Sequence, residues 1–374
     1  MEGRIIPVGE ITAAELAAWR DLAARALEPN PFLEPDCIIA SVRHGQAARG
    51  LALLVACEGG EMHGLVTVRR LERLGRLPRR ALTTRPDDDP VPVRPVVGVP
   101  LLAAAFPADA AEAMLRAAAE TRPAHAAHAG LLLLDRLHGG EKVAGMFGDA
   151  AARLGFPSCE IESWERCVFR FEAANESWPG SLGRGRTERL ARRRERLGAD
   201  FVAETGPGAI SRFLALEASG WKGAAGTAMA CDPQKEAFFR ELCDRFAQRL
   251  SWTSIEVGGA PVAMKCLFRA GASVFSAKTA FDESFAAFGP GVELTVRTVE
   301  HLRTEARTEV LDPCHSPGNG HYRALFPDRR QISTLLVAVG GTLDRAAVAL
   351  YGRRKGRAAS QVRPTRLTDH TPRR

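Results

Sequence analysis

Apolar and polar positions in the first half of the chain switch between strand-like and helix-like spacing. The spacing predicts a strand at Arg4–Gly9, two helices, and two strands joined by the glycine pair Gly59-Gly60, which favours a hairpin. A polar, proline-rich stretch from 76 to 95 is typical of an irregular loop. The apolar run GLLLLDRL is typical of a strand buried on both faces. Helices are predicted at 12–27, 34–44, 108–121 and 141–154, and further strands start near 51, 63, 130 and 167.

The second half of the chain repeats this order of elements. Its pattern predicts a strand, two helices, a second Gly-Gly hairpin, a third strand, a helix, a strand, a short helix and a last strand. These elements are expected at 201–204, 210–219, 233–250, 251–259, 260–271, 273–281, 293–304, 308–314, 322–326 and 332–340. The repetition predicts two copies of one mixed α/β unit rather than one large sheet.

The element order also predicts the domain boundaries. We expect a first unit over 1–172 and a second over 200–355, joined over 173–199 by a linker and one basic helix. Residues 356–374 are polar with few apolar positions, so we expect a disordered tail there.

Composition narrows the class of protein. The 374 residues are 45% hydrophobic and 25% charged, which excludes a mostly disordered chain. No apolar run approaches the ~18–20 residues of a membrane span, and no basic stretch followed by an apolar block opens the chain. We therefore expect a cytoplasmic protein. The eight cysteines lie far apart, without metal-binding spacing, so we expect no metal.

The net charge of +7 has two interpretations. Arginine carries nearly all of the positive charge and alanine is abundant, as a GC-rich genome would produce by codon usage alone. The other interpretation is a preference for anionic partners.

The strongest chemical signal is a strand-to-helix junction. The strand SVFSAKTAF is followed by Gly289-Pro290-Gly291 and then by an amphipathic helix. Glycines let a backbone approach a ligand closely, and the first turn of a helix offers free N–H groups and a positive dipole end. The junction therefore predicts an anion site suited to a pyrophosphate. The alternative is a turn that only starts the helix.

Four motifs carry a resemblance to a known family. They are EPNPFLEPD (28–36), ASGWKGAAGTAM (218–229), KTAFDESFAAFGPGVEL (278–294) and DPCHSPGNGHYRALFPDRR (312–330). Together with the element order, they resemble the GNAT acyltransferases of the branch related to the cellulose-biosynthesis protein CelD, which is similar to the FemAB transferases with two GNAT-like domains. The superfamily usually opens its pyrophosphate loop with Arg or Gln, and here that position is Ala286.

The resemblance implies a fold of tandem GNAT-like domains and transfer of an acyl group from acetyl-CoA or a longer acyl-CoA to an amine or hydroxyl. It implies that the fourth strand of the second unit splays from its neighbour and binds the cofactor, together with the loop. The implied cofactor-binding residues are Ala277, Thr279, Phe281, Phe288, Gly289, Gly291 and Val292. It also places Tyr322 as the group that protonates the leaving thiolate.

The other candidate residues follow the next strand or flank the first helices. Asp312 and His315 are candidate bases at the end of the strand TEVLDPC, and Glu217 is a further candidate base. Substrate contacts are expected at Trp221, Lys222, Lys278 and Asp282. Each has a structural alternative: Asp312 capping a turn before proline, His315 as an exposed loop residue, Tyr322 as packing, and Lys278 with Asp282 as an ion pair.

The basic helix leaves the donor open. It carries Arg184, Arg186, Arg189, Arg192, Arg193, Arg194 and Arg196, which can be a solvated face or bind CoA phosphate, an anionic membrane surface or tRNA. No aromatic residue is interleaved for base stacking, so nucleic acid is the minor option. The leading hypothesis is an acyl-CoA-dependent N-acyltransferase acting on a small-molecule or lipid amine. The alternatives are an aminoacyl-tRNA-dependent transferase and a non-catalytic component of an envelope-polysaccharide system.

Overall fold

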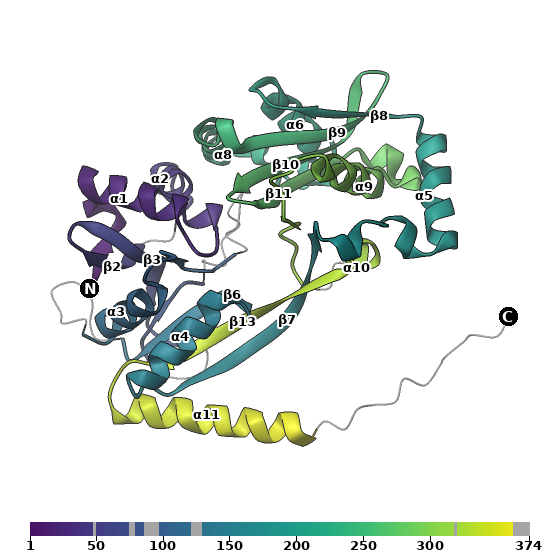
Figure 1. The fold of residues 1–374 in the computed structure, drawn as a ribbon. Coiled ribbons are helices and arrows are strands. Elements are labelled where there is room, and N and C mark those ends of the chain that lie inside the picture. Colours follow the sequence, from purple (N-terminus) through teal and green to yellow (C-terminus); the bar gives the residue numbers. More distant parts are fainter. Residues whose placement is uncertain (48–49, 75–78, 86–96, 121–128, 318–319, 362–374) are drawn as a thin grey trace.

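The structure is a computed structural model, and it describes residues 1–47, 50–74, 79–85, 97–120, 129–317 and 320–361 (Figure 1). Its helices and strands follow the predicted order in both halves. The first half contains β1 (Glu2–Pro7), α1 (Ala13–Ala24), α2 (Pro35–Arg43), β2 (Ala52–Glu58), β3 (Glu61–Leu71), β4 (Ala81–Thr83), β5 (Leu101–Leu102), α3 (Pro107–Glu120), β6 (Leu131–Gly139), α4 (Lys142–Arg153) and β7 (Ser158–Arg170).

The second half follows after the basic helix α5 (Arg184–Leu197). It contains β8 (Asp200–Glu204), α6 (Gly208–Ser219), α7 (Trp221–Ala224), α8 (Pro233–Arg245), β9 (Leu250–Val257), β10 (Ala260–Ala270), β11 (Ser273–Phe281), α9 (Pro290–Arg303), β12 (Val310–Asp312), α10 (Gly320–Leu325), β13 (Asp328–Ala338) and α11 (Thr342–Gln361). Short 3-10 helices lie at Val8–Glu10, Pro31–Leu33, Ala173–Asn175, Gly180–Leu182, Met229–Cys231, Ala247–Arg249 and Glu283–Phe288.

The two halves form one sheet, which corrects the prediction of two separate units. The strand order is β1-β2-β3-β4-β6-β13-β7-β12-β11-β10-β9-β8, and β5 pairs with β3. The last strand of each half has changed places: β13 lies between β6 and β7, and β7 pairs with β12 (Figure 1). β13, which lies within the range 200–355 expected for the second unit, therefore completes the sheet of the first half, and the domain boundaries stay a prediction.

Three local predictions also differ from the structure. The stretch expected to be an irregular loop contains β4, which pairs with β3 and with β6; residues 76–78 and 86–95 of that stretch lie outside the described part. β7 begins nine residues earlier than the predicted strand, because it pairs along most of its length with β13. α11 continues to Gln361, so 356–361 of the expected tail is helical, and 362–374 is not described.

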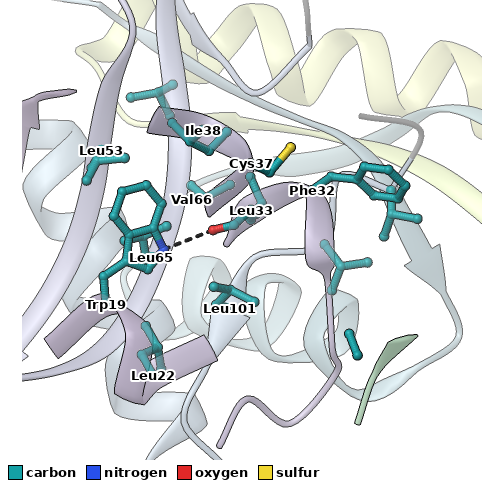
Figure 2. Close-up of a cluster of buried hydrophobic side chains, with 14 of the residues drawn as sticks. Trp19, Leu22, Phe32, Leu33, Cys37, Ile38, Leu53, Leu65, Val66 and Leu101 are labelled. Atoms are coloured by element: carbon teal, nitrogen blue, oxygen red, sulfur yellow. Dashed lines mark hydrogen bonds between the residues drawn. The ribbon is translucent and has the colours of Figure 1, made fainter. Parts of the chain in front are cut away.

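Part of the core of the first half forms where α1 packs against β3 and contacts α2. Trp19 is fully buried there, and its indole N–H donates to the carbonyl of Leu33 at 2.9 Å (Figure 2). Leucine, isoleucine and valine side chains from the strands and both helices surround the ring (Figure 2). This burial is the main favourable term for such a layer, at about 25 cal/mol per Å² of apolar surface. No helix in the described part of the chain is long and apolar enough to cross a membrane.

Candidate functional site

The sheet opens between β11 and β12. The two strands run parallel over only three residue pairs, ending at Phe275 with Asp312. β11 continues to Phe281 while β12 stops, so the rest of β11 loses its neighbour on that side. A bulge leaves Ala277 without a counterpart in β10. The splay expected for the fourth strand is therefore present, and its open edge offers backbone N–H and C=O groups to a ligand.

The helix α9 begins at the glycine-proline-glycine turn. Gly289 has a φ of 65°, in the left-handed region that glycine adopts without strain. Its carbonyl accepts from the N–H groups of Val292 and Glu293, and its own N–H donates to Ala286. Residues 289–292 carry three backbone N–H groups, because Pro290 has none. Only the N–H of Gly291 makes no hydrogen bond to another described residue. The expected row of free amides is thus reduced to one, because the turn satisfies the others internally.

The space in front of this turn is open. A Cβ added to Gly291 would meet no heavy atom within 4 Å. One at Gly289 would lie 3.5 Å from the Arg193 guanidinium, so the basic helix α5 stands beside the turn (Figure 1). Arg194 pairs with Glu293 at 2.6 Å and offsets its charge in the first turn. An anion approaching Gly291 would therefore meet one N–H, the helix dipole and a neighbouring arginine.

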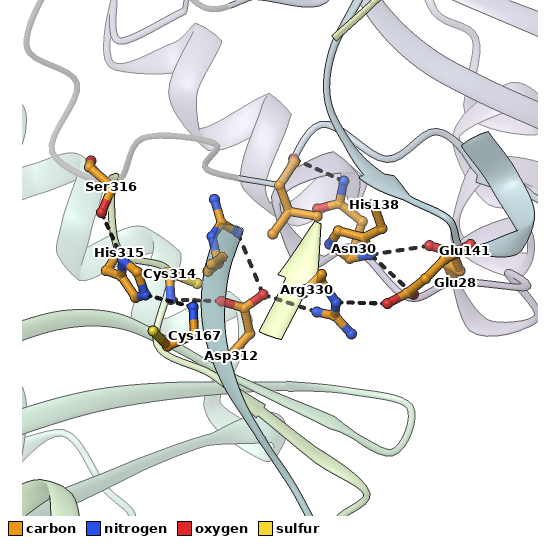
Figure 3. Close-up of polar contacts among 12 residues, drawn as sticks. Glu28, Asn30, His138, Glu141, Cys167, Asp312, Cys314, His315, Ser316 and Arg330 are labelled. Atoms are coloured by element: carbon orange, nitrogen blue, oxygen red, sulfur yellow. Dashed lines mark hydrogen bonds and ion pairs between the residues drawn. The ribbon is translucent and has the colours of Figure 1, made fainter. Parts of the chain in front are cut away.

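Asp312 is committed to a buried ion cluster (Figure 3). Its carboxylate is fully buried and accepts from Arg330 at 3.0 Å, Arg166 at 3.5 Å and the Cys314 N–H at 2.8 Å. Burial raises the pKa of Asp312, but the two arginines outweigh it and hold the pKa below its usual range. These contacts argue against Asp312 as the general base, because the ionised form is stabilised and its oxygens are occupied.

His315 also has both ring nitrogens occupied. Its Nε2 accepts from the Cys167 N–H at 3.0 Å, and its Nδ1 donates to the carbonyl of Ser316 at 2.7 Å (Figure 3). Burial lowers the pKa of His315, so the imidazole is held neutral. The ring stacks on Tyr322 with centroids 5.3 Å apart. The hydrogen bonds argue against His315 as a base, since no nitrogen is left to take a proton.

Tyr322 lies beside Lys265, Ser276 and Thr295, which the sequence analysis missed. Burial raises its pKa to about 12, and the hydroxyls of Thr279, Thr295 and Ser276 act against that rise. The Lys265 ammonium lies 5.7 Å from the centroid of its ring. The one sequence signal for this cluster was a lysine in the middle of the otherwise apolar strand PVAMKCLF. The Ser276 and Thr279 hydroxyls beside the phenol belong to β11, just past the point where β12 stops, and the role of Tyr322 stays a prediction.

Thr295, in the second turn of α9, contacts Lys265, His321 and the carbonyl of Gly291. Its hydroxyl donates to the carbonyl of Gly291 at 2.8 Å and accepts from the Lys265 Nζ at 3.2 Å. The His321 Nε2 lies 3.2 Å from the same oxygen. Burial lowers the pKa of His321 to about 4, so this imidazole is neutral at pH 7.

Glu217 joins two of the expected substrate lysines. Its Oε1 lies 3.0 Å from the Nζ of Lys222 and 3.5 Å from that of Lys278, and its Oε2 accepts from the Met229 N–H at 3.0 Å. Burial raises the pKa of Glu217. Lys278, the Met229 N–H and Lys222 together lower it by more, so the net shift of this pKa is downward. Glu217 is therefore another ionised carboxylate without a free oxygen.

A small pocket lies beside this carboxylate. Its walls come from α6, α7 and the free end of β11, and its lining residues are Leu216, Glu217, Gly220, Trp221, Lys222, Thr279, Ala280, Phe281 and Glu283. Trp221 is 60% exposed at its rim. Asp282 does not pair with Lys278, so that prediction is wrong: Asp282 accepts from the Ser284 N–H instead and caps a 3-10 helix.

A second polar group lies on the side of the first half (Figure 3). Glu28, His138 and Glu141 bring one possible ligand atom each within 4.8 Å of one another. The carboxylates already have partners: Glu28 accepts from the Val143 N–H at 2.8 Å, and Glu141 accepts from Arg330 at 2.9 Å. Arg330 also donates to Asp312. We therefore interpret the group as part of an ion-pair network that joins the two halves.

Residues 183–323 match the family model described as an acetyltransferase (GNAT) domain. The match runs from the start of the basic helix into α10, where it ends at Arg323, so it includes the splayed β11, the turn of α9 and Tyr322. It supports an enzyme of the acyltransferase type. No curated protein matches the chain, and the CelD branch stays a prediction.

Solved structures show the same fold around the GNAT domain. FemX is 10% identical with a TM-score of 0.57, over 94% of this chain and 100% of that one. A conserved protein of unknown function from Bacteroides thetaiotaomicron is 14% identical with a TM-score of 0.55, over 87% and 97%. The C-terminal domain of a putative lysylphosphatidylglycerol synthetase from Agrobacterium fabrum is 14% identical with a TM-score of 0.54, over 91% and 95%. The expected mixed α/β fold is confirmed, and the match to the GNAT model lies in its second half.

Proposed function

We propose that this protein is an acyl-CoA-dependent N-acyltransferase that moves an acyl group directly from the CoA thioester to an amine. The observation that carries the proposal is the open edge of β11 beyond Phe275, which lies inside the matched GNAT domain and leads to the turn of α9. Extended pantetheine carries amide groups that can pair with such an edge as an added strand would. Acyl-CoA is used in the cytoplasm, which is where we expect the enzyme.

The cofactor is proposed to bind in two parts. The β11 edge at Ala277 and Thr279 pairs with the pantetheine, and the Gly291 N–H with Arg193 receives the pyrophosphate. The turn supplies fewer amides than the superfamily loop implies, so the arginines of α5 supply more of the attraction. Phe288 ends the 3-10 helix before the turn. The Cζ of Arg196 lies over its ring, 5.4 Å from the ring centroid, so Phe288 helps to position the arginine side chain.

The acceptor is proposed to enter through the pocket lined by Trp221 and Lys222. The base candidates Asp312, His315 and Glu217 have their basic atoms occupied. The amine therefore reacts in its unprotonated form, and the proton it loses passes to water. Tyr322 donates its proton to the thiolate when the C–S bond breaks, since its raised pKa keeps the hydroxyl protonated.

A paired substitution tests the donor. Gly291→Glu places a carboxylate in front of the turn, where nothing lies within 4 Å, and we expect it to weaken acetyl-CoA binding at least roughly tenfold by charge repulsion. Gly208→Glu is the matched control, because Gly208 also opens a helix, α6, with nothing within 4 Å. Calorimetric titration measures both. Folded wild-type protein that binds neither acetyl-CoA nor longer acyl-CoAs would contradict the proposal.

A second candidate uses aminoacyl-tRNA as the donor. Two observations favour it: the fold similarity to FemX, and the exposed arginines on α5, which are Arg184, Arg186, Arg189, Arg192, Arg193 and Arg196. This candidate predicts tRNA binding that falls steeply with salt and is lost in an Arg184→Gln, Arg189→Gln, Arg192→Gln variant, which keeps Arg193 at the turn of α9. Transfer from acyl-CoA in the absence of tRNA, retained by that variant, would reject it.

A further inference from the structure

Lys265 has an unusual environment for a lysine. Its side chain is fully buried in β10, and no carboxylate of the described residues lies within ion-pair distance. Its Nζ donates to the Thr295 hydroxyl at 3.2 Å. The same Nζ lies over the face of the Tyr322 ring, 5.7 Å from the ring centroid. Burial lowers the pKa of Lys265 to about 7. Lysine is rarely buried without an anionic partner, because its charge then costs free energy that nothing nearby offsets.

The other half of the molecule shows that the fold does not require this lysine. β2–β3 and β9–β10 are equivalent hairpins with glycine pairs at their turns and a register shift at the same place. Counting from the first turn glycine, the position of Lys265 corresponds to Val66, which is buried. Its cross-strand neighbour Thr253 likewise corresponds to Leu54. An apolar pair fills the same two positions where no site is present.

The groups that face Lys265 carry no negative charge. On α10, His321 is neutral and Tyr322 keeps its proton, because burial lowers the pKa of the first to about 4 and raises that of the second to about 12. His315 and Cys314, in the loop before α10, are held neutral by burial as well. The charge of Lys265 is therefore balanced only when an anion forms nearby.

We propose that Lys265 is a positioning residue that stabilises the negative charge left on Tyr322 as the thiolate departs. This rests on the proposed function. The amine nitrogen bonds to the carbonyl carbon, the C–S bond breaks with its electron pair on sulfur, and the Tyr322 hydroxyl proton moves to that sulfur. The tyrosinate that remains faces the Lys265 ammonium until a proton from water restores the phenol. The proton lost by the amine passes to water, so the protons balance.

The location of Lys265 makes this role different from substrate binding. It has no exposed surface, so it acts on the reaction only through Tyr322 and Thr295. Thr295 donates its own hydrogen bond to the carbonyl of Gly291, so the first turn of α9 is held without Lys265. The charged form is the useful one, and it is lost as the pH rises through about 7. The proposal thus predicts a falling limb in kcat near that pH.

Lys265→Met tests the proposal, because methionine fills a similar volume without the charge. We expect kcat to fall at least roughly tenfold, less than the about 10²–10³-fold loss from removing a donor that touches the reacting atoms. KM for acyl-CoA should change less than about twofold, because Lys265 does not touch the donor. The falling limb near pH 7 should disappear, and the midpoint of thermal unfolding should rise, since an unbalanced charge has left the interior. Lys235→Met, at a lysine near the surface of α8, is the control.

Two results would overturn the proposal. One is a variant with the kcat and pH profile of the wild type. The other is a variant that loses stability and acyl-CoA affinity together, which would make Lys265 structural; Lys265→Gln repeats the measurement if methionine prevents folding. A wild type that binds no acyl-CoA defeats the proposed function and this inference with it. An active wild type with an unaffected variant defeats only the role of Lys265.

Discussion

α3 and α9 occupy corresponding places in the two halves and bury different chemistry. α3 presents mainly alanine and leucine side chains to β1, β2 and β3, and glycines let it approach closely: a Cβ on Gly3 would lie 2.1 Å from the carbonyl oxygen of Ala113. α9 instead buries Glu293, Thr295 and Thr298 against β9, β10 and β11. One architecture therefore supports a dry helix–sheet contact in one half and a polar one in the other.

The two threonines of this polar contact are hydrogen-bonded, whereas the Oε2 of Glu293 has no hydrogen-bond partner among the described residues. The Thr253 and Thr298 hydroxyls bond to each other at 3.0 Å, and Thr295 serves Lys265, His321 and the helix backbone. A hydrogen bond of this kind contributes only about 0.5–1.5 kcal/mol, whereas an unpaired buried group costs about 1–3 kcal/mol. The first half holds the molecule together by apolar burial, and the second half accepts a less stable interior where the site is proposed.

The largest effect is expected from moving the polar chemistry across. Val66→Lys puts an amine at the position equivalent to Lys265, without a threonine on the facing helix to receive it. We expect a loss of several kcal/mol in the free energy of unfolding, roughly the scale of an unpaired buried charge, or failure to fold. Val42→Lys, at a 41% exposed valine on α2, is the control. Urea unfolding measures both, and a stable Val66→Lys protein would show that the two interiors tolerate charge alike.

A loss almost as large is expected from Asp312→Asn. Removing the charge leaves Arg166 and Arg330 buried without their shared carboxylate, which costs about 3–5 kcal/mol. Because the folded pKa of Asp312 is lowered, its contribution is present above the ordinary pKa of 3.8 and is lost as the pH falls through the folded value. The variant should lose that acid dependence. Asp149→Asn, at an exposed residue, is the control, and normal stability with lost turnover would instead make Asp312 catalytic.

Tyr322→Phe separates chemistry from packing in the polar half. Phenylalanine keeps the ring that stacks on His315 but removes the proton donor. We expect turnover to fall about 10²–10⁴-fold, the range for general acid catalysis, while the unfolding free energy changes by about 1 kcal/mol or less. Steady-state kinetics and thermal unfolding are measured together. Unchanged turnover would remove Tyr322 from the proposed mechanism.

The smallest effects come from glycines at the two helices. Gly3→Ala should cost about 1–3 kcal/mol of unfolding free energy, because the added carbon runs into the backbone of α3. Gly291→Ala meets nothing within 4 Å and should leave stability within about 0.5 kcal/mol. The pair is compared by chemical denaturation. Equal losses would contradict the difference in packing described above.

The fold was predictable as far as local pattern determines it. The spacing of apolar residues located the hairpins, α3, α6 and α9 within a few residues, because each pattern reports the face that one element buries. It did not reveal the exchange of β7 and β13, since the spacing within a strand is the same whichever neighbour it pairs with. β4 was missed because a three-residue strand next to prolines and arginines has too few positions to show alternation.

The position of the candidate site was more predictable than the roles of its residues. The glycine turn and the splay of β11 were expected from motifs, whereas the contacts of Glu217 with Lys222 and Lys278 were not. The roles of Asp312 and His315 depended on partners far along the chain: Arg166 is 146 residues from Asp312, and Cys167 is 148 from His315. Lys265 was not singled out because its meaning depends on burial, which one lysine in an apolar strand does not disclose.

The exchanged strands also govern how this protein can be made and divided. A nascent chain that ends near residue 172 has β6 without β13 beside it, and the sheet of the first half closes only after β13, at Asp328–Ala338, has been synthesised. Until then both β6 and β7 present bare edges that another chain could pair with. Fragments cut at the midpoint would therefore be poor autonomous modules, and coexpressed halves would have to trade strands before either became whole.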